Sequence, residues 1–226
     1  MPGQRTRDAL LEHGALLLAR HGVARLTARQ LHEAVGARNE SALHYHFGSI
    51  DGLVAAIIRL HVEEVEARRV PVVDAIRGQG QTGDLRALVR ALAVPMSEDL
   101  ATPVGRAHLR VIAQLSHPAL AYEMPFQAGD APAGTAVVKW LWLALHGLPE
   151  VIRVERMALL RAQLISGFGL RSQLIDDDPD VHGRPEATEL FVENLVDVIV
   201  AGLRAEPSPE ALEAAVTRPR TRTARR

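Results

Sequence analysis

The chain has 226 residues, with 26 Lys and Arg against 27 Asp and Glu, and it contains no cysteine. Without cysteine there is no disulfide framework, no thiolate zinc site and no cysteine nucleophile, so enzymes that rely on any of these are excluded. The N-terminus lacks the apolar stretch of a secretory signal, and the longest apolar run falls far short of the roughly 20 residues that cross a bilayer. We therefore expect a soluble, cytoplasmic protein of one or two domains.

The net charge of -1 is distributed unevenly along the chain. Residues 1–48 contain six Arg against four acids, and residues 217–226 contain five Arg and no acid, which leaves a net charge of -8 on the segment between them. A polyanion would be attracted to the two ends and repelled by the middle.

The spacing of apolar residues predicts an all-α chain, because Ala, Leu, Arg and Glu recur at helical intervals and the alternation typical of strands is absent. Gly22 and Gly36 end helices, Thr27 and Ser49 cap them, and the Gly-rich segment 78–84 interrupts the pattern. The predicted helices span about residues 5–21, 27–35, 39–47, 50 to beyond 71 with a kink at the proline there, 85–100, 103–115, 135–145, 150–175 and 187–204.

Two short helices joined by a Gly-containing turn, within residues 27–47, have the form of a helix-turn-helix. We predict an N-terminal domain of residues 1–52 that ends inside the following long helix, because no flexible linker separates it from a larger helical domain of residues 53–206. A helix shared by two domains can transmit motion. The tail, residues 207–226, is basic at its end, and we expect that end to be disordered.

Residues 26–53 read LTARQLHEAVGARNESALHYHFGSIDGL, and here the chain resembles the TetR family of bacterial transcriptional regulators. The motifs that carry the resemblance are Thr27 at the start of a helix, the turn at residues 35–37, the run from Leu43 to Phe47, and residues 49–53 at the start of the next helix. The resemblance covers about residues 6–55. Beyond them, only the length and the helical pattern agree with the family.

The resemblance implies a homodimer that binds a palindromic double-stranded DNA operator through its third helix and releases it when a small molecule occupies a C-terminal ligand-binding and dimerisation domain. It implies a repressor with no catalytic activity and no cofactor. Three features depart from the family pattern: His44 stands where Tyr is usual, the turn to Phe47 is one residue longer than the commonest form, and Ile50 replaces a Lys that contacts phosphate.

The helical periodicity of the third helix predicts which side chains face DNA. If Leu43 faces the core, Phe47 lies about 40° from it, and Ser41, Ala42 and Tyr45 point outward. Small side chains permit close approach to DNA, and a phenol suits a phosphate or a thymine methyl group, while a helix N-terminus attracts phosphate. The predicted DNA-contacting residues are Thr27, Arg29, Arg38, Asn39, Ser41, Ala42, His44, Tyr45 and His46.

Two patterns in the larger domain concern assembly and ligand binding. The segment 195–203, LVDVIVAGL, is apolar on nearly every side, which indicates burial by two layers. The resemblance implies that the last two long helices form a four-helix dimer interface; a plain core helix is the alternative. The predicted interface residues are Gly167, Phe168, Leu195, Val196, Ile199 and Leu203. The resemblance also implies a ligand cavity, for which core packing is the alternative. Its predicted lining is Met96, His117, Tyr122, Phe126, Trp140, Trp142 and Met157.

The sequence has two alternative functional interpretations. A metal hydrolase would use the histidines and the acidic segment 176–182, but His44 and His46 lie about 200° apart on a helix and cannot share one ion, so we predict no metal site. We expect the acidic segment to be a solvated loop, and His13, His21, His32 and His61 to be solvated or capping residues. A protein that keeps the fold and sequesters a ligand without binding an operator is the second alternative, and the Ile50 departure favours it.

Overall fold

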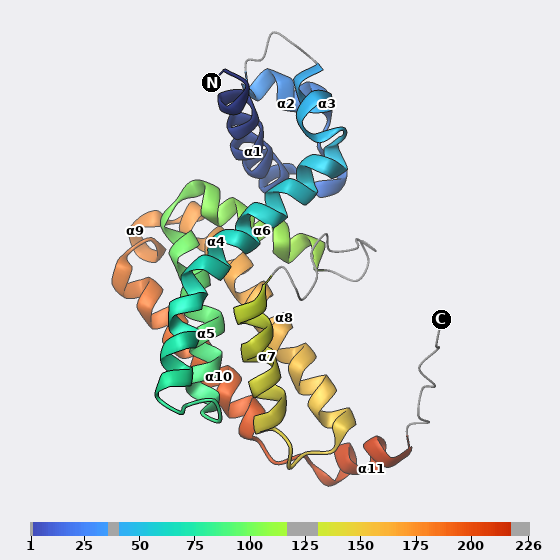
Figure 1. The fold of residues 1–226 in the computed structure, drawn as a ribbon, viewed down its shortest axis with the longest axis vertical. Helices are drawn as coiled ribbons and strands as arrows, with labels where there is room; N and C mark the ends of the chain where they lie inside the picture. Colours follow the sequence, from blue (N-terminus) through green and yellow to red (C-terminus); the bar gives the residue numbers. More distant parts are fainter. Residues whose placement is uncertain (1, 36–40, 117–130, 218–226) are drawn as a thin grey trace.

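The computed structural model describes residues 2–35, 41–116 and 131–217, and throughout this part of the chain the regular structure is helical, without a strand. This confirms the predicted all-α class. Figure 1 shows an elongated molecule in which a small N-terminal bundle adjoins a larger helical body. None of the helices in these described ranges combines the length and the hydrophobicity that crossing a bilayer requires.

The predicted helices are present, with small shifts at their ends, and two short helices, α9 and α11, were not predicted. The segment expected to be a solvated acidic loop instead forms the end of one helix and a four-residue helix. The elements are α1 (Pro2–His21), η1 (Val23–Arg25), α2 (Ala28–Val35), α3 (Ser41–Phe47), α4 (Ile50–Gly78), α5 (Leu85–Ser97), η2 (Glu98–Ala101), α6 (Pro103–Leu115), α7 (Pro132–Ala144), α8 (Glu150–Asp177), α9 (Pro179–His182), α10 (Pro185–Arg204) and α11 (Pro209–Thr217).

Side-chain caps set the helix boundaries that the sequence predicts. Thr27 and Gln30 bond reciprocally: the Gln30 side chain accepts from the Thr27 amide at 2.9 Å, and the Gln30 amide donates to the Thr27 hydroxyl at 3.3 Å. The Ser49 hydroxyl accepts from the Gly52 amide at 3.0 Å and so begins α4. These caps begin α2 and α4, which precede and follow α3 in the chain.

Hydrophobic side chains form two separate clusters. The first joins α1, α2 and α3 to the first turns of α4, and we call this part, residues 2–35 and 41–58, the headpiece. The second lies among α5, α7, α8 and α10 around the fully buried Phe168, in the body, residues 59–116 and 131–217. Helix α4 contributes to both clusters, with Ile57 and Ile58 in the first and Val73 in the second. The domain boundary near Leu53 stays a prediction, and α4 packs with the headpiece through Ile58.

A buried ion pair fixes α7 to α4. Glu66 and Arg69 are both buried and lie 3.0 Å apart, and the Arg69 guanidinium also donates to the Ala91 carbonyl at 3.1 Å. The Glu66 carboxylate accepts hydrogen bonds from the amides of Ala133 and Gly134 at the start of α7. A carboxylate at a helix N-terminus satisfies amides that lack an intrahelical partner, which compensates for its burial.

Helix α6 is the second structural link between headpiece and body. Its Ala107 and Val111 are buried in the headpiece cluster, whereas Leu109 is buried in the body cluster. On the body side it packs closely against α8, because a Cβ atom placed on Gly169 would come within 2.6 Å of the Ala113 Cβ. The two helices can approach this closely only with glycine at position 169.

We expect Gly169→Ala to destabilise the protein by about 1–3 kcal/mol, because the short Ala113 side chain cannot move aside and α6 must shift from α8. Gly167→Ala, two residues away on the same helix, is the matched control. There the new Cβ meets Leu195 at an ordinary 3.4 Å, so we expect a gain of about 0.5–1 kcal/mol from helix propensity. Urea unfolding of both variants tests the pair, and equal stabilities would contradict the close packing.

Candidate nucleic-acid interface and junction pocket

The helix-turn-helix presents one side of α3 to solvent. Tyr45 is 83% exposed, the neighbouring His44 is exposed, and Leu43 is buried at 6% exposure. The predicted orientation of α3 is therefore confirmed for Leu43 and Tyr45. The His46 ring is half-buried and meets the Tyr45 ring edge to face, with centroids 4.9 Å apart, while the Arg7 guanidinium of α1 lies 5.7 Å from the centre of the Phe47 ring. The end of α3 is thereby held against α1.

One predicted outward residue needs correction. Ala42 is half-buried and packs against the headpiece cluster, so it lies at the edge of the exposed face rather than on it. Arg29 is exposed and forms an ion pair with Glu33 at 2.8 Å on the same helix. Thr27 is exposed but its hydroxyl is engaged with Gln30. Arg38, Asn39 and the side chain of Ser41 lie outside what the structure describes, so their predicted contacts stay predictions.

For four of the predicted dimer-interface residues the assignment is wrong, because their side chains are buried inside the single chain. Phe168 and Val196 are 0% exposed, Ile199 is 1% exposed and Leu203 is 3% exposed, so no surface of theirs is left for a partner. These four side chains belong to the core of the chain, as the core-helix alternative predicted. Gly167 and Leu195 meet at the seam between α8 and α10, where both are half-buried, and their role at an interface stays a prediction.

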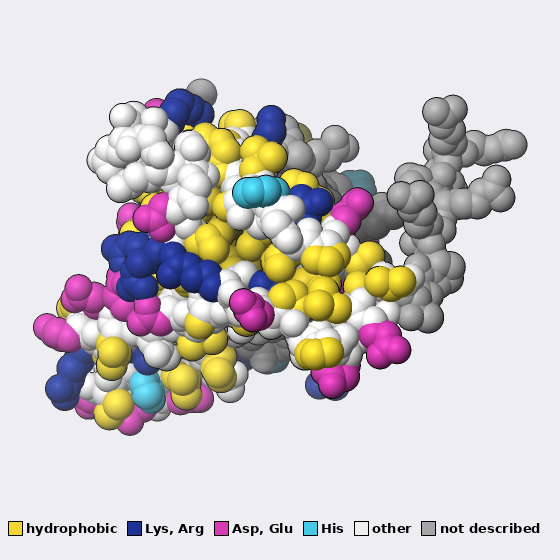
Figure 2. Space-filling model, turned by 90° about the horizontal axis from the view of Figure 1, so that it is seen from below, with side chains coloured by type: hydrophobic (Ala, Val, Ile, Leu, Met, Phe, Trp, Pro, Cys, Tyr) yellow, Lys and Arg dark blue, Asp and Glu magenta, His cyan; other side chains and the backbone are white. Residues whose placement is uncertain are grey.

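Other apolar side chains of α8 and α10 are exposed. Leu159 and Leu170 of α8 are 61% and 60% exposed and lie within about 20° of each other around the helix. Leu190 and Val198 of α10 are 71% and 50% exposed on the outer side of their helix. Figure 2 shows that hydrophobic side chains are also exposed among charged ones on the underside of the molecule.

The predicted ligand-lining residues are only partly described. Met96, Trp140 and Met157 are half-buried and pack against the body cluster. The Arg77 guanidinium lies 5.7 Å from the Trp140 ring centre, and Arg153 lies 4.2 Å from that of Trp142. His117, Tyr122 and Phe126 lie outside the described residues, and a cavity lined by this set stays a prediction.

The acidic segment after α8 has structural roles. Asp176 accepts hydrogen bonds from Arg106 and Arg110 of α6, and Asp178 caps α9 by accepting from the Val181 amide at 3.2 Å. His182 contacts Arg171. Within residues 2–35, 41–116 and 131–217, no group of three or more His, Asp or Glu side chains is arranged to hold a metal ion. The metal-hydrolase alternative has no ligand set in this part of the chain.

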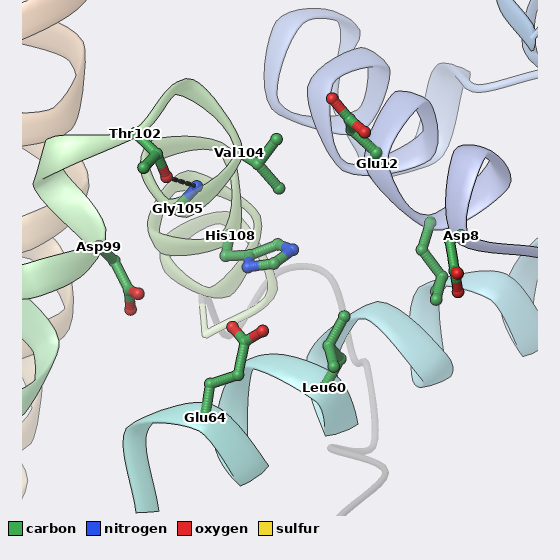
Figure 3. A pocket seen from close by; sticks show the side chains of 10 residues that line it. Asp8, Glu12, Leu60, Glu64, Asp99, Thr102, Val104, Gly105 and His108 are labelled. Carbon is green, nitrogen blue, oxygen red and sulfur yellow. Dashed lines mark hydrogen bonds between the residues drawn. The ribbon is translucent and has the colours of Figure 1, made fainter. Parts of the chain in front are cut away.

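A pocket of about 360 Å³ lies where headpiece and body meet. Its walls come from α1, α4, η2 and the start of α6, and Figure 3 shows their side chains arranged around His108. This site is not visible in the sequence, because its residues are far apart in the chain. The lining residues are Asp8, Leu11, Glu12, Leu60, Glu64, Asp99, Thr102, Val104, Gly105 and His108.

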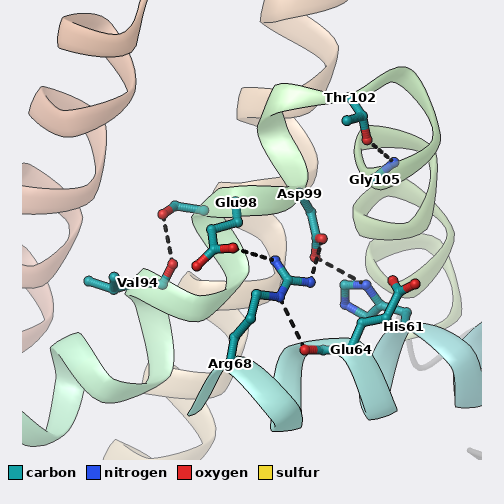
Figure 4. A network of polar contacts seen from close by, with 9 residues as sticks. His61, Glu64, Arg68, Val94, Glu98, Asp99, Thr102 and Gly105 are labelled. Carbon is teal, nitrogen blue, oxygen red and sulfur yellow. Dashed lines mark hydrogen bonds and ion pairs between the residues drawn. The ribbon is translucent and has the colours of Figure 1, made fainter. Parts of the chain in front are cut away.

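A buried polar network borders the pocket (Figure 4). Arg68 of α4 donates to Asp99 of η2 at 2.7 Å and lies 3.9 Å from Glu98. His61 Nδ1 is 3.2 Å from Asp99 Oδ2, but the two are not aligned for a hydrogen bond. Burial raises the pKa of Asp99 to about 6 against the opposing effect of Arg68. Asp99 is therefore mostly ionised at neutral pH and paired with Arg68.

Two histidines of this network are buried and neutral. His61 is 3% exposed and His108 is 4% exposed, and their rings meet with centroids 5.6 Å apart. Burial lowers the pKa of His61 to about 3, with a further contribution from His108, and burial followed by the Arg68 charge lowers the pKa of His108 to about 4. The expectation that His61 is a solvated or capping residue is wrong. Its position on the buried stripe of α4, three and four residues from Ile58 and Ile57, is the signal that would have revealed it.

The His108 pKa predicts that acid destabilises the fold. Between about pH 6.5 and pH 4 the unfolded chain binds a proton at His108 that the folded chain does not, so stability falls as the pH falls through this window. Between pH 7 and pH 5, we expect the free energy of unfolding of His108→Gln to fall by about 2 kcal/mol less than that of the parent chain. Urea unfolding at each pH measures this difference.

Asp99 titrates in the opposite sense, since its raised pKa makes the folded chain take up that proton first, but this contribution is common to both proteins. His21→Gln, at an exposed position, is the control for replacing a histidine by glutamine. A His108→Gln profile parallel to that of the parent would contradict a buried neutral imidazole.

No protein-family model matches the chain, and no curated protein matches it. One solved structure that is similar to it is described as "Molecular basis for control of antibiotic production by a bacterial hormones". The similarity has 23% sequence identity and a TM-score of 0.48, and it covers 89% of this chain and 98% of the other.

Proposed function

We propose that the chain is a transcriptional regulator of the TetR type: a cytoplasmic homodimer that binds palindromic DNA through α3 and responds to a small molecule in its body. The observation that carries this is the exposed Tyr45 on a short helix whose opposite side, at Leu43, is buried in a helix-turn-helix. A side chain of this size left 83% exposed on a short helix, beside an exposed imidazole, suits a surface that a ligand as large as DNA covers.

The geometry supports a response to a ligand because headpiece and body share rigid elements. Helix α4 runs without interruption from the capping residue Ser49 through Pro71 to Gly78, and α6 packs against both parts. A ligand that prefers one arrangement of these helices changes the distance between the two α3 helices of a dimer. Half-sites about one helical turn apart are then no longer matched, which releases the DNA.

The test is binding to DNA from the region upstream of the chain's own gene, followed by fluorescence anisotropy, with unrelated DNA of the same length as competitor. We expect preferential binding that weakens steeply as salt rises, since contacts to phosphate release counterions. A chain that binds both DNAs equally weakly would overturn the proposal and favour the ligand-sequestering alternative.

A further inference from the structure

The junction pocket has walls that belong to both parts of the molecule. Helix α1 of the headpiece contributes Asp8 and Glu12, and the body contributes Glu64 of α4 and residues 99–108 of η2 and α6. Its volume of about 360 Å³ falls within the range of pockets that hold small ligands. Any ligand that fills it contacts headpiece and body at once.

The charges around the pocket are predominantly negative. Four carboxylates line it, and one of them, Asp99, is paired with Arg68 at 2.7 Å. Asp8 has Arg7 at 3.8 Å. For Glu12 and Glu64 the described residues provide no ion-pair partner, and both side chains are exposed to the pocket's solvent. With His108 neutral, no cation of the lining balances these two charges.

A buried nitrogen beside the pocket, Nδ1 of His108, lacks a hydrogen-bond partner, and the His108 side chain is only 4% exposed. Oδ2 of Asp99 faces His61 Nδ1 at 3.2 Å and so belongs to the neighbouring polar network. Figure 3 shows the His108 ring extending into the space between α4, α1 and Val104. An unpaired buried polar atom destabilises the fold, so a ligand that donates a hydrogen bond here adds a stabilising interaction.

We propose that the junction pocket binds a small organic cation, a protonated amine or amidine with an apolar part. Glu12 and Glu64 would hold its charge, and the neutral His108 ring would accept a hydrogen bond from one of its N–H groups. Leu11, Leu60 and Val104 provide an apolar wall for the rest of the ligand.

The same observations disfavour other ligand classes. An anion would meet four carboxylates at close range. A metal ion needs several ligands converging on one point, and among the described residues no such group exists. A neutral apolar molecule would leave the His108 ring nitrogen and the carboxylates of Glu12 and Glu64 without partners.

This inference deepens the proposed function, on which its regulatory part rests, by naming a ligand class and a place for it. A cation held between Glu12 of α1 and Glu64 of α4 favours one angle between headpiece and body. Since α1 also packs against α3 through Arg7 and Phe47, that angle sets the position of the helix proposed to contact DNA.

Benzamidine, a flat amidinium, is the probe, and neutral benzamide of the same shape is its control. Isothermal titration of the full chain in the absence of DNA should show saturable binding of benzamidine and none of benzamide. Glu12→Gln and Glu64→Gln should each weaken benzamidine binding about tenfold, because each removes a charge-assisted contact and leaves the shape of the pocket unchanged. Both positions are exposed, so the variants are expected to fold.

Glu63→Gln is the matched control, since Glu63 is exposed on the same helix, adjacent to Glu64, and does not line the pocket. It should bind benzamidine as the parent does. The site is overturned if benzamidine does not bind, if benzamide binds equally well, or if the Glu12 and Glu64 variants keep the parent affinity.

A second arm repeats the DNA measurement with benzamidine at saturation. We expect DNA affinity to change at least about fivefold, and the benzamidine concentration that gives half of this change to rise about tenfold in Glu64→Gln. Unchanged DNA affinity with intact benzamidine binding would overturn the coupling. A chain that binds no DNA would overturn the proposed function, while the titration without DNA would still decide the cation site.

Discussion

Val198→Asp is expected to give a folded monomer, whereas Ile199→Asp, at the next residue, is expected to unfold the chain. Val198 is 50% exposed on the outer side of α10, and Ile199 is 1% exposed in the body cluster. An aspartate at position 199 would bury an unpaired charge, which costs several kcal/mol and is a large part of the stability of a domain this size. An aspartate at position 198 of an isolated chain stays in water and costs within about 0.5 kcal/mol.

The proposed dimer is expected to depend on Val198, because this side chain is one of four large apolar side chains that α8 and α10 leave exposed, with Leu159, Leu170 and Leu190. Large exposed apolar side chains on two adjacent long helices are typical of a protein interface. Across a symmetric interface, Val198→Asp places two carboxylates in apolar surroundings, which opposes association. DNA binding should fall with it, because one headpiece reaches only one half-site.

Sedimentation velocity distinguishes a dimer from a monomer, and circular dichroism with thermal unfolding reports the fold. Asp at position 216 is the control for an added charge on an apolar surface, since Val216 of α11 is 87% exposed and lies on another helix. If Val198→Asp and Leu190→Asp both remain dimers with the parent stability, the proposed interface lies elsewhere.

These neighbouring residues also show where sequence reasoning reached its limit. The apolar run 195–203 predicts burial on most sides, but within the single chain residues 197, 198, 201 and 202 are exposed, and only Val196, Ile199, Val200 and Leu203 are buried. The run carries no information on which side faces the chain's own core. The register of α10 against α8 decides it, and that register depends on side chains such as Phe168 and Phe191, whose rings meet edge to face at 5.3 Å. A contact 23 residues apart in sequence is not visible in local periodicity.

In the headpiece, local signals were sufficient to predict where α2 and α4 begin and how Leu43 and Tyr45 of α3 are oriented. The Thr27 and Ser49 caps fix the ends of α2 and α4, and a seven-residue helix with one buried leucine has a single outward side. The junction pocket could not be predicted in this way, because Asp8, Glu64 and His108 come together only when α1, α4 and α6 cross. Three acidic or imidazole side chains on separate helices look individually like ordinary surface residues.

Tyr45→Ala is expected to weaken binding to the specific DNA site about 10- to 100-fold while leaving the stability of the chain within about 0.5 kcal/mol of the parent. The stability should hold because a ring that is 83% exposed contributes little to the core. The binding should fall because Tyr45 is the largest exposed side chain of α3 and would lie between the helix and the DNA. Anisotropy with the upstream DNA and urea unfolding measure the two effects.

Tyr45→Phe separates the two roles of the side chain, because it removes the hydroxyl and keeps the ring. If the hydroxyl contacts a phosphate, Tyr45→Phe weakens binding to all DNA sequences alike and lowers the salt slope by about one. If the ring packs on a thymine methyl group, Tyr45→Phe binds as the parent does, and Tyr45→Ala loses discrimination at one base pair. Parent-like binding by Tyr45→Ala would move the DNA contact away from the exposed side of α3, and the proposed interface would fail with it.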